Sequence, residues 1–182
     1  MYSFTSLDIP GYRGSVANTF IRQEQEAQHL GIVYPGLGYN ASMPLLYYPA
    51  RLLTAQGADV LRVEYEYDRA KLGSLPEYER ERWLALDAGA AWEVALAQRP
   101  YRQVTLIGKS LGTLALGRLL TTMGELPPLR ALWLTPLLRS EHLHAQMIQV
   151  RQPSLLVIGT ADAHYDAALL ESVREATGAE TL

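Results

Sequence analysis

Short apolar runs along the chain alternate with longer segments in which the apolar positions recur at helical spacing. Runs of four to six apolar residues bounded by Gly, Pro or polar residues are typical of buried strands, whereas a recurrence every three to four residues indicates a helix. We therefore expect strands at Leu30–Tyr34, Val60–Tyr65, Val104–Ile107, Ala131–Thr135 and Ser154–Ile158.

Helical patterns fill the segments between these strands. They run from Ser42 to Gly57, from about Tyr78 to Gln98, from just after Ser110 to Met123, from Ser140 to Val150 and from Tyr165 to Ala176. Ser42 is the expected N-cap of the first helix, which should kink at Pro49. Gly178 suits the C-terminal cap of the last helix.

Strand and helix alternate from residue 30 onward, after two weaker strands expected at Tyr2–Ile9 and Ser15–Ile21. This order predicts one α/β domain over residues 1–182, with a mostly parallel sheet and helices on both faces. We interpret the Tyr-rich polar segment at 66–73 as a solvated loop and residues 125–128 as a turn. Ligands bind at the carboxyl ends of the strands in such sheets, so the residues that follow each strand are the functional candidates.

Composition narrows the class of protein. Of 182 residues, 48% are hydrophobic and 19% are charged, which indicates a folded chain with a substantial core. The formal net charge of -3 offers no basic surface for nucleic acid, and we expect neither a nucleic-acid nor a membrane partner. The chain has no cysteine, so it can form neither disulfides nor a thiolate metal site. Its start does not resemble a signal peptide, and we expect a cytoplasmic protein. We expect no cofactor.

The segment Gly108-Lys109-Ser110-Leu111-Gly112 lies between a predicted strand and a predicted helix. A sharp strand-to-helix turn exposes a serine at the top of a sheet, the flanking glycines relieve crowding, and the helix N-terminus favours developing negative charge. The pattern predicts that Ser110 is a nucleophile. The alternative is a glycine-rich turn with a solvated serine.

Two phosphate-binding motifs can be excluded. Gly108-Lys109-Ser110 resembles the end of a P-loop, but that motif needs a glycine at position 103, where the chain has Gln. Gly36-Leu37-Gly38 does not continue into a dinucleotide fingerprint, because position 41 is Ala.

The loop Tyr34-Pro35-Gly36-Leu37-Gly38-Tyr39 follows a predicted strand and is a candidate oxyanion loop. Two backbone N–H groups from separate loops commonly stabilise a tetrahedral oxyanion, and we expect those of Leu37 and Leu111 to do so. Tyr39 and Asn40 are candidate substrate contacts. A simple Pro-Gly turn is the alternative.

Asp162 follows the late strand at Ser154–Ile158. An acid at this place fits the chain order Ser, then Asp, then His of a catalytic triad. The alternative is that Asp162 caps the following helix.

The elbow at 108–112, the Pro35-Gly36-Leu37-Gly38 loop and Gly159-Thr160-Ala161-Asp162 resemble the α/β-hydrolase superfamily, especially its dienelactone-hydrolase-like and carboxylesterase-like members. The resemblance covers roughly residues 28–177, with Pro35 at a place where members often have His. It implies that Ser110 attacks the carbonyl of a small ester or thioester and that Asp162 orients a histidine base.

The base histidine is the element that the sequence leaves open. His29 precedes a strand and should lie at the opposite end of the sheet, while His142 and His144 fit the polar face of a helix start. His164 and His144 are therefore only weak base candidates. His142 and His144 lack a convincing third ligand for a metal.

Three explanations compete for the missing base. We expect that the chain is part of a longer hydrolase whose histidine lies beyond residue 182. Alternatively His164 or His144 is an unusual base, or the protein is a catalytically inactive binding module. As partners we expect an ester-like small molecule, with a homodimer left open.

Overall fold

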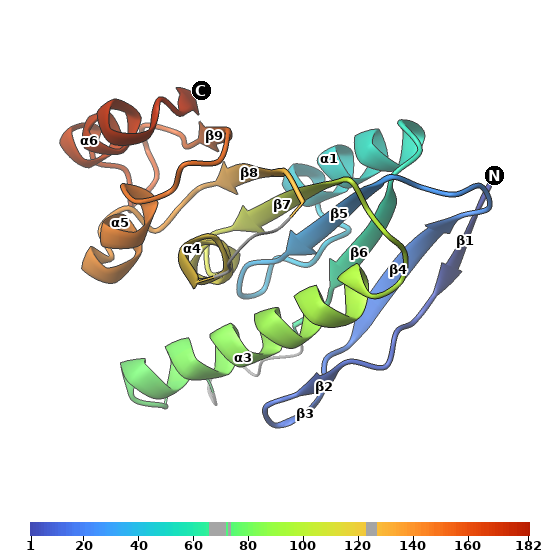
Figure 1. Ribbon diagram of the computed structural model, residues 1–182. Helices are drawn as coiled ribbons and strands as arrows, with labels where there is room; N and C mark the ends of the chain where they lie inside the picture. Colours follow the sequence, from blue (N-terminus) through green and yellow to red (C-terminus); the bar gives the residue numbers. More distant parts are fainter. Residues whose placement is uncertain (66–71, 73, 123–126) are drawn as a thin grey trace.

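The computed structural model describes residues 1–65, 72, 74–122 and 127–182 (Figure 1). The predicted solvated loop at 66–73 lies outside the described residues, except for residue 72. The first half of the turn predicted at 125–128 also lies outside them.

An eight-stranded sheet in the order β1-β4-β6-β5-β7-β8-β9-β10 forms the centre of the molecule. The six strands from β6 to β10 along this order run parallel, while β4 pairs antiparallel with both β1 and β6. The strands are β1 Tyr2–Thr5, β4 Asn18–Gln23, β5 His29–Tyr34, β6 Asp59–Val63, β7 Gln103–Lys109, β8 Leu129–Leu134, β9 Ser154–Val157 and β10 Glu180–Thr181, with a separate hairpin of β2 Pro10–Gly11 and β3 Gly14–Ser15.

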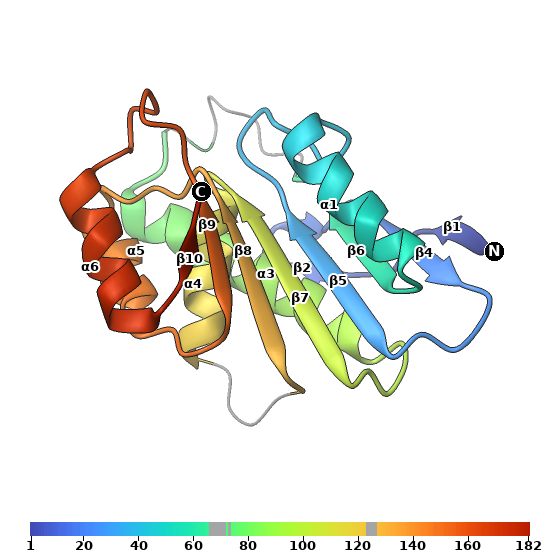
Figure 2. The same ribbon diagram turned by 90° about the horizontal axis from the view of Figure 1, so that it is seen from above.

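The helices cover both faces of the sheet, which confirms the predicted three-layer α/β architecture. Figure 2 looks onto the face that carries α1, while α3, α4, α5 and α6 lie on the other face. Their bounds are α1 Pro44–Ala55, α3 Glu77–Leu96, α4 Gly112–Thr122, α5 Glu141–Met147 and α6 Ala167–Thr177. In the ranges that the structure describes, no helix is long and apolar enough to cross a bilayer.

The apolar core is divided by the sheet. The larger cluster lies beneath α3–α6 and contains fully buried side chains such as Trp133, Leu106 and Phe20. The smaller cluster lies beneath α1 and includes Leu46, Val60 and Ile107. Neighbouring residues of β7 therefore alternate between the two clusters, as a strand buried on both faces requires.

Several predicted boundaries differ from the structure. The early strands are shorter and displaced, because the β2–β3 hairpin interrupts them and the Asn18 side chain bonds to the Leu7 backbone at the start of β4. Met43 rather than Ser42 is the N-cap of α1, since the Ser42 hydroxyl accepts a hydrogen bond from Arg62. The final helix begins at Ala167 rather than Tyr165, with Asp166 as its N-cap.

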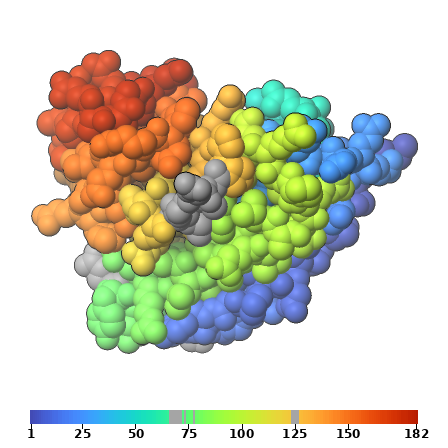
Figure 3. Space-filling model, viewed as in Figure 1, coloured from blue at the N-terminus to red at the C-terminus, as the bar shows by residue number. Residues whose placement is uncertain are grey.

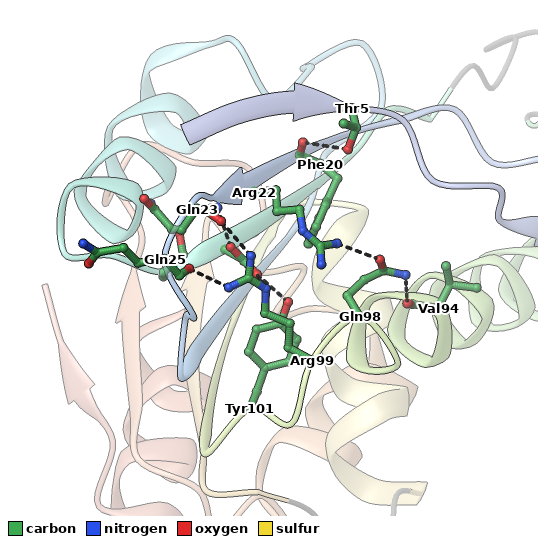
Figure 4. A network of polar contacts seen from close by, with 11 residues as sticks. Thr5, Phe20, Arg22, Gln23, Gln25, Val94, Gln98, Arg99 and Tyr101 are labelled. Atoms are coloured by element: carbon green, nitrogen blue, oxygen red, sulfur yellow. Dashed lines mark hydrogen bonds and ion pairs between the residues drawn. The ribbon is translucent and has the colours of Figure 1, made fainter. Parts of the chain in front are cut away.

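A buried polar network holds the amino end of the sheet together (Figure 4). Asp59, the fully buried first residue of β6, accepts hydrogen bonds from the Tyr101 hydroxyl (2.7 Å) and the Gln23 backbone N–H (2.7 Å). The Arg99 Nε lies 3.1 Å from the same carboxylate, and its other nitrogens donate to the carbonyls of Gln23 and Gln25. Burial and then the bond to Asp59 raise the pKa of Tyr101. The network lies at the end of the sheet opposite Ser110 and serves the fold.

Candidate active site

Ser110 occupies the turn between β7 and α4 and has a left-handed backbone with φ of 50°. Its N–H donates to the Leu134 carbonyl of β8 (2.9 Å), and its carbonyl accepts from the Thr113 N–H (2.8 Å). A left-handed conformation costs a residue with a side chain about 1–2 kcal/mol. The neighbouring strand and the first turn of α4 hold Ser110 in this conformation, half-buried at the carboxyl end of the sheet.

The two elbow glycines are required by close packing. A Cβ on Gly108 would lie 2.7 Å from the Gly112 carbonyl oxygen and 2.7 Å from a Leu116 methyl carbon. A Cβ on Gly112 would overlap the Tyr34 carbonyl oxygen and lie 2.8 Å from that of Pro35. The elbow thus packs tightly on its own helix and on the loop that follows β5.

The candidate oxyanion loop lies directly against Ser110. A Cβ on Gly36 would be 3.3 Å from the Ser110 Cβ and 3.2 Å from the Lys109 carbonyl oxygen. The Leu37 and Leu111 N–H groups donate no hydrogen bond within the part of the chain that the structure describes. Gly36, next to Leu37, thus lies against the turn that contains Ser110 and Leu111, at the ends of the adjacent strands β5 and β7.

Tyr39 and Asn40 complete this loop in different ways. The Tyr39 N–H donates to the Gly36 carbonyl (3.3 Å), and the Tyr39 hydroxyl accepts from the Leu45 N–H at the start of α1 (3.0 Å). The exposed Asn40 accepts a hydrogen bond from the Ser42 N–H (3.0 Å). Both side chains therefore hold the connection between the loop and α1.

Asp162 lies in the loop after β9 and does not cap the following helix. The helix-cap alternative is wrong for Asp162, because the side chain of Asp166 accepts from the Ala168 and Leu169 N–H groups. Asp162 instead closes a tight loop, in which its carboxylate accepts from the His164 N–H (2.8 Å).

Lys109, the residue before the serine, is a feature of the site that the sequence reasoning missed. Its Nζ lies 4.6 Å from the centre of the Tyr39 ring. Burial lowers the pKa of Lys109, while the charge of Asp162 acts in the opposite direction. Lys109 of the elbow therefore interacts with two loops. It contacts Tyr39 of the candidate oxyanion loop, and it feels the charge of Asp162 in the loop that follows β9, which we call the acid loop. The only sequence signal for Lys109 was its place beside Ser110.

Two of the four histidines, His29 and His142, contact residues other than those of the elbow. His29 is at the amino end of β5, as expected, and its Nε2 lies 2.9 Å from the Thr105 hydroxyl. Burial and then Arg130 lower its pKa. His142, on the outer side of α5, contacts the Gln146 amide (3.1 Å).

The two base candidates are placed differently. The Nε2 of His144 lies 2.8 Å from the Ser172 hydroxyl, which links α5 to α6. His164 is exposed in the loop after β9, and it contacts Asp162 through its backbone N–H. In the described ranges, no three His, Asp or Glu side chains form a group that could hold a metal.

A separate cavity of about 460 Å³ opens between α3, α4 and α5, whose surfaces adjoin on the face seen in Figure 3. Leu114, one turn into α4 from Ser110, forms part of its wall together with Leu84 and Leu86, and charged or polar side chains stand at its rim. Its volume falls in the usual range for small-molecule sites. Ser110 does not line this cavity, so it is distinct from the elbow.

Comparison with solved structures identifies the fold. The esterase Pf2001 of Pyrococcus furiosus matches with a TM-score of 0.73 and 14% identity, over all of this chain and 80% of its own. The dienelactone hydrolase-like promiscuous phosphotriesterase P91 from metagenomic libraries matches with a TM-score of 0.74 and 17% identity, over 100% and 80%. XC6422 of Xanthomonas campestris, a serine hydrolase without a lid, matches with a TM-score of 0.68 and 20% identity, over 100% of this chain and 82% of its own.

The chain thus has the α/β-hydrolase fold, and it spans about four fifths of the length of these neighbours. No protein-family model matches the sequence. No curated relative matches it either.

Proposed function

We propose that the protein is a serine hydrolase that cleaves a small carboxylic ester or thioester through an acyl-enzyme on Ser110. The observation that carries this proposal is the left-handed backbone of Ser110 between two glycines whose Cβ positions are occupied by neighbouring atoms. Backbone strain of this kind clusters at functional sites, where the surrounding structure holds it in place. The esterases among the structural neighbours support the same class of reaction.

The chemistry follows from the placement of each group. The base takes the hydroxyl proton of Ser110 as its Oγ attacks the acyl carbonyl. The negative charge that develops on the carbonyl oxygen is stabilised by the Leu37 and Leu111 N–H groups and by the N-terminus of α4. The tetrahedral intermediate then expels the alcohol or thiol, which takes a proton from the base, and water releases the acid in the second half of the reaction. Asp162 is the proposed carboxylate that orients the base.

Three candidates remain for that base: His164, His144 and a histidine outside residues 1–182. We expect His144→Ala and His164→Ala to keep activity close to that of the unmodified protein, because the His144 ring is engaged with Ser172 and His164 is exposed. A loss of about 10²-fold or more in either variant would identify that residue as the base, since general acid–base catalysis contributes about this much.

The direct test is hydrolysis of a p-nitrophenyl ester by purified variants. Ser110→Ala should lower kcat by about 10³-fold or more, because the covalent route is lost. Asp162→Asn should lower kcat strongly with the fold retained. Ser3→Ala, which removes an exposed hydroxyl from β1, is the matched control and should leave kcat unchanged. Full activity in Ser110→Ala would contradict the proposal.

A catalytically inactive binding protein with this fold is the second candidate. It is favoured by one observation, that none of the histidine side chains in the described ranges hydrogen-bonds to a residue of the elbow. A folded protein that neither hydrolyses esters nor reacts at Ser110 would contradict the first function and favour this second one.

A further inference from the structure

The side chain of Lys109 lies across the loop that supplies the Leu37 amide. Its Cδ is 3.1 Å from the position of a Cβ on Gly36, and the Ser110 Cβ is 3.3 Å from the same position. The lysine methylenes and the nucleophile therefore flank one point of the loop backbone. A side chain at Gly36 would displace one of them.

The ammonium group of Lys109 continues along the loop to Tyr39. Its Nζ lies 4.6 Å from the ring centre, within the range of a cation–π interaction. The Tyr39 ring is itself fixed, because its hydroxyl accepts from the Leu45 N–H and its backbone N–H donates to Gly36. Lys109 thus contacts both residues that flank Leu37-Gly38.

The loop needs such support for a physical reason. Gly38 has a φ of 67°, and Gly36 also lacks a side chain, so the backbone on either side of Leu37 has unusual conformational freedom. An oxyanion donor is effective only when it already points at the position of the developing charge. A small rotation of this segment would turn the Leu37 N–H away from the carbonyl oxygen.

We propose that Lys109 is a positioning residue for the oxyanion hole, whose stem packs on Gly36 and whose ammonium packs on the Tyr39 ring to hold the Leu37 N–H in place. The inference rests on the proposed hydrolase function and adds to it a role for the residue before the nucleophile. Lys109 acts through the loop and does not itself exchange a proton with the substrate.

The role has a pH signature. Within the described ranges, the Lys109 ammonium faces the Tyr39 ring on the candidate oxyanion loop and feels the negative charge of Asp162 on the acid loop. Because burial lowers the pKa of Lys109, the ammonium is lost at a lower pH than in a free lysine, and the contact with Tyr39 weakens as pH rises through that value. We expect kcat to decline on the alkaline side, and we expect Lys109→Arg to move this decline to higher pH because arginine stays charged.

Steady-state kinetics of three variants test the role. Lys109→Met keeps the stem and removes the charge, so kcat should fall by about tenfold with KM unchanged, since the loss is confined to the transition state. Lys109→Arg should recover most of the rate. A boronic acid that forms a tetrahedral adduct on Ser110 should lose affinity by the same factor as kcat. Arg102→Met removes an exposed cation just before β7, at the opposite end of that strand, and should change nothing.

A double-mutant cycle shows whether the effect passes through Tyr39. Tyr39→Leu should resemble Lys109→Met, and the double variant should be no worse than either, because both remove one contact. Additive losses, an unchanged kcat in Lys109→Met, or a Lys109→Arg variant as slow as Lys109→Met would each overturn the proposal.

A separate readout distinguishes this inference from the hydrolase function. The chain has only two lysines, Lys71 and Lys109, so NMR of the ¹³C-dimethylated protein gives three signals, one from each lysine and one from the α-amino group of Met1. The Lys109→Met variant assigns the signal of Lys109. One signal should be shifted by the Tyr39 ring, and Tyr39→Leu should remove that shift. Absence of any shifted signal would refute the contact. An inactive protein that retains the shift would refute the hydrolase function, and with it the catalytic role, while leaving the contact in place.

Discussion

At the scale of single residues, two strained positions stand side by side at the carboxyl end of the sheet. Ser110 has a φ of 50° and Thr135 a φ of 43°, and they follow the paired residues Lys109 and Leu134. The Ser110 N–H donates to Leu134, and the Thr135 N–H donates to Val157 of the next strand. Each strained residue is held by its neighbouring strand, so the sheet offsets the conformational cost.

Gly112→Ala tests whether the close packing around Gly112 leaves no room for a side chain at this position. The added methyl group would meet the Tyr34 and Pro35 carbonyls, so the free energy of unfolding should fall by about 1–3 kcal/mol. Urea denaturation measures the change. Gly89→Ala on α3 is the matched control, because no described atom beyond its chain neighbours and the nearby backbone of α3 lies within 4 Å of its Cβ position. Alanine favours a helix over glycine, so this control should be neutral or stabilising by up to about 1 kcal/mol. Equal stability of the two variants would contradict the geometry.

The elbow could be predicted from the sequence because a strand-to-helix change of period at Gly-x-Ser-x-Gly is a local pattern. The role of Lys109 could not be predicted, since it depends on where the loop after β5 lies relative to β7. Chain order makes Asp162 a candidate acid, but only the structure could show that Asp166 rather than Asp162 is the cap of α6.

At the scale of elements, the order of strands and helices followed from hydrophobic periodicity, while their ends depended on side-chain contacts. α6 shows both cases. Gly178 caps it with a φ of 70°, as glycine's conformational freedom predicts, whereas its start is set by Asp166, whose carboxylate accepts two backbone N–H groups. Ser42 was expected to cap α1, but its hydroxyl accepts a hydrogen bond from Arg62 of β6.

Asp166→Ala and Asp162→Asn form a matched pair at this scale. Asp166→Ala removes a cap and should lower the free energy of unfolding by about 1 kcal/mol, with little effect on kcat. Asp162→Asn should show the reverse pattern. Thermal denaturation and ester hydrolysis of both variants separate the two roles. A loss of stability in Asp162→Asn with kcat preserved would assign Asp162 to the fold alone.

At the scale of the whole molecule, the two ends of the parallel strands serve different purposes. The amino ends are tied by the Asp59, Arg99 and Tyr101 network, which links β4 and β6 to the segment between α3 and β7. The carboxyl ends carry Ser110, the candidate oxyanion loop and the acid loop. Stability and proposed chemistry are therefore separated by the length of the sheet.

Asp59→Asn tests this separation. The substitution leaves the buried Arg99 guanidinium without its counter-ion, and breaking a buried pair costs about 3–5 kcal/mol. We expect a large fall in the free energy of unfolding, with kcat per folded molecule unchanged, because the network is at the far end from Ser110. Denaturation curves and active-site titration measure the two quantities. A fall in kcat of the folded fraction would show that the two ends are coupled.

The central claim is that Ser110 is a nucleophile, and labelling with a fluorophosphonate probe followed by peptide mass spectrometry tests it most directly. The account predicts one adduct per chain, located on Ser110 and absent from Ser110→Ala. A folded protein that takes up no probe, or that is labelled equally in the alanine variant, would contradict it.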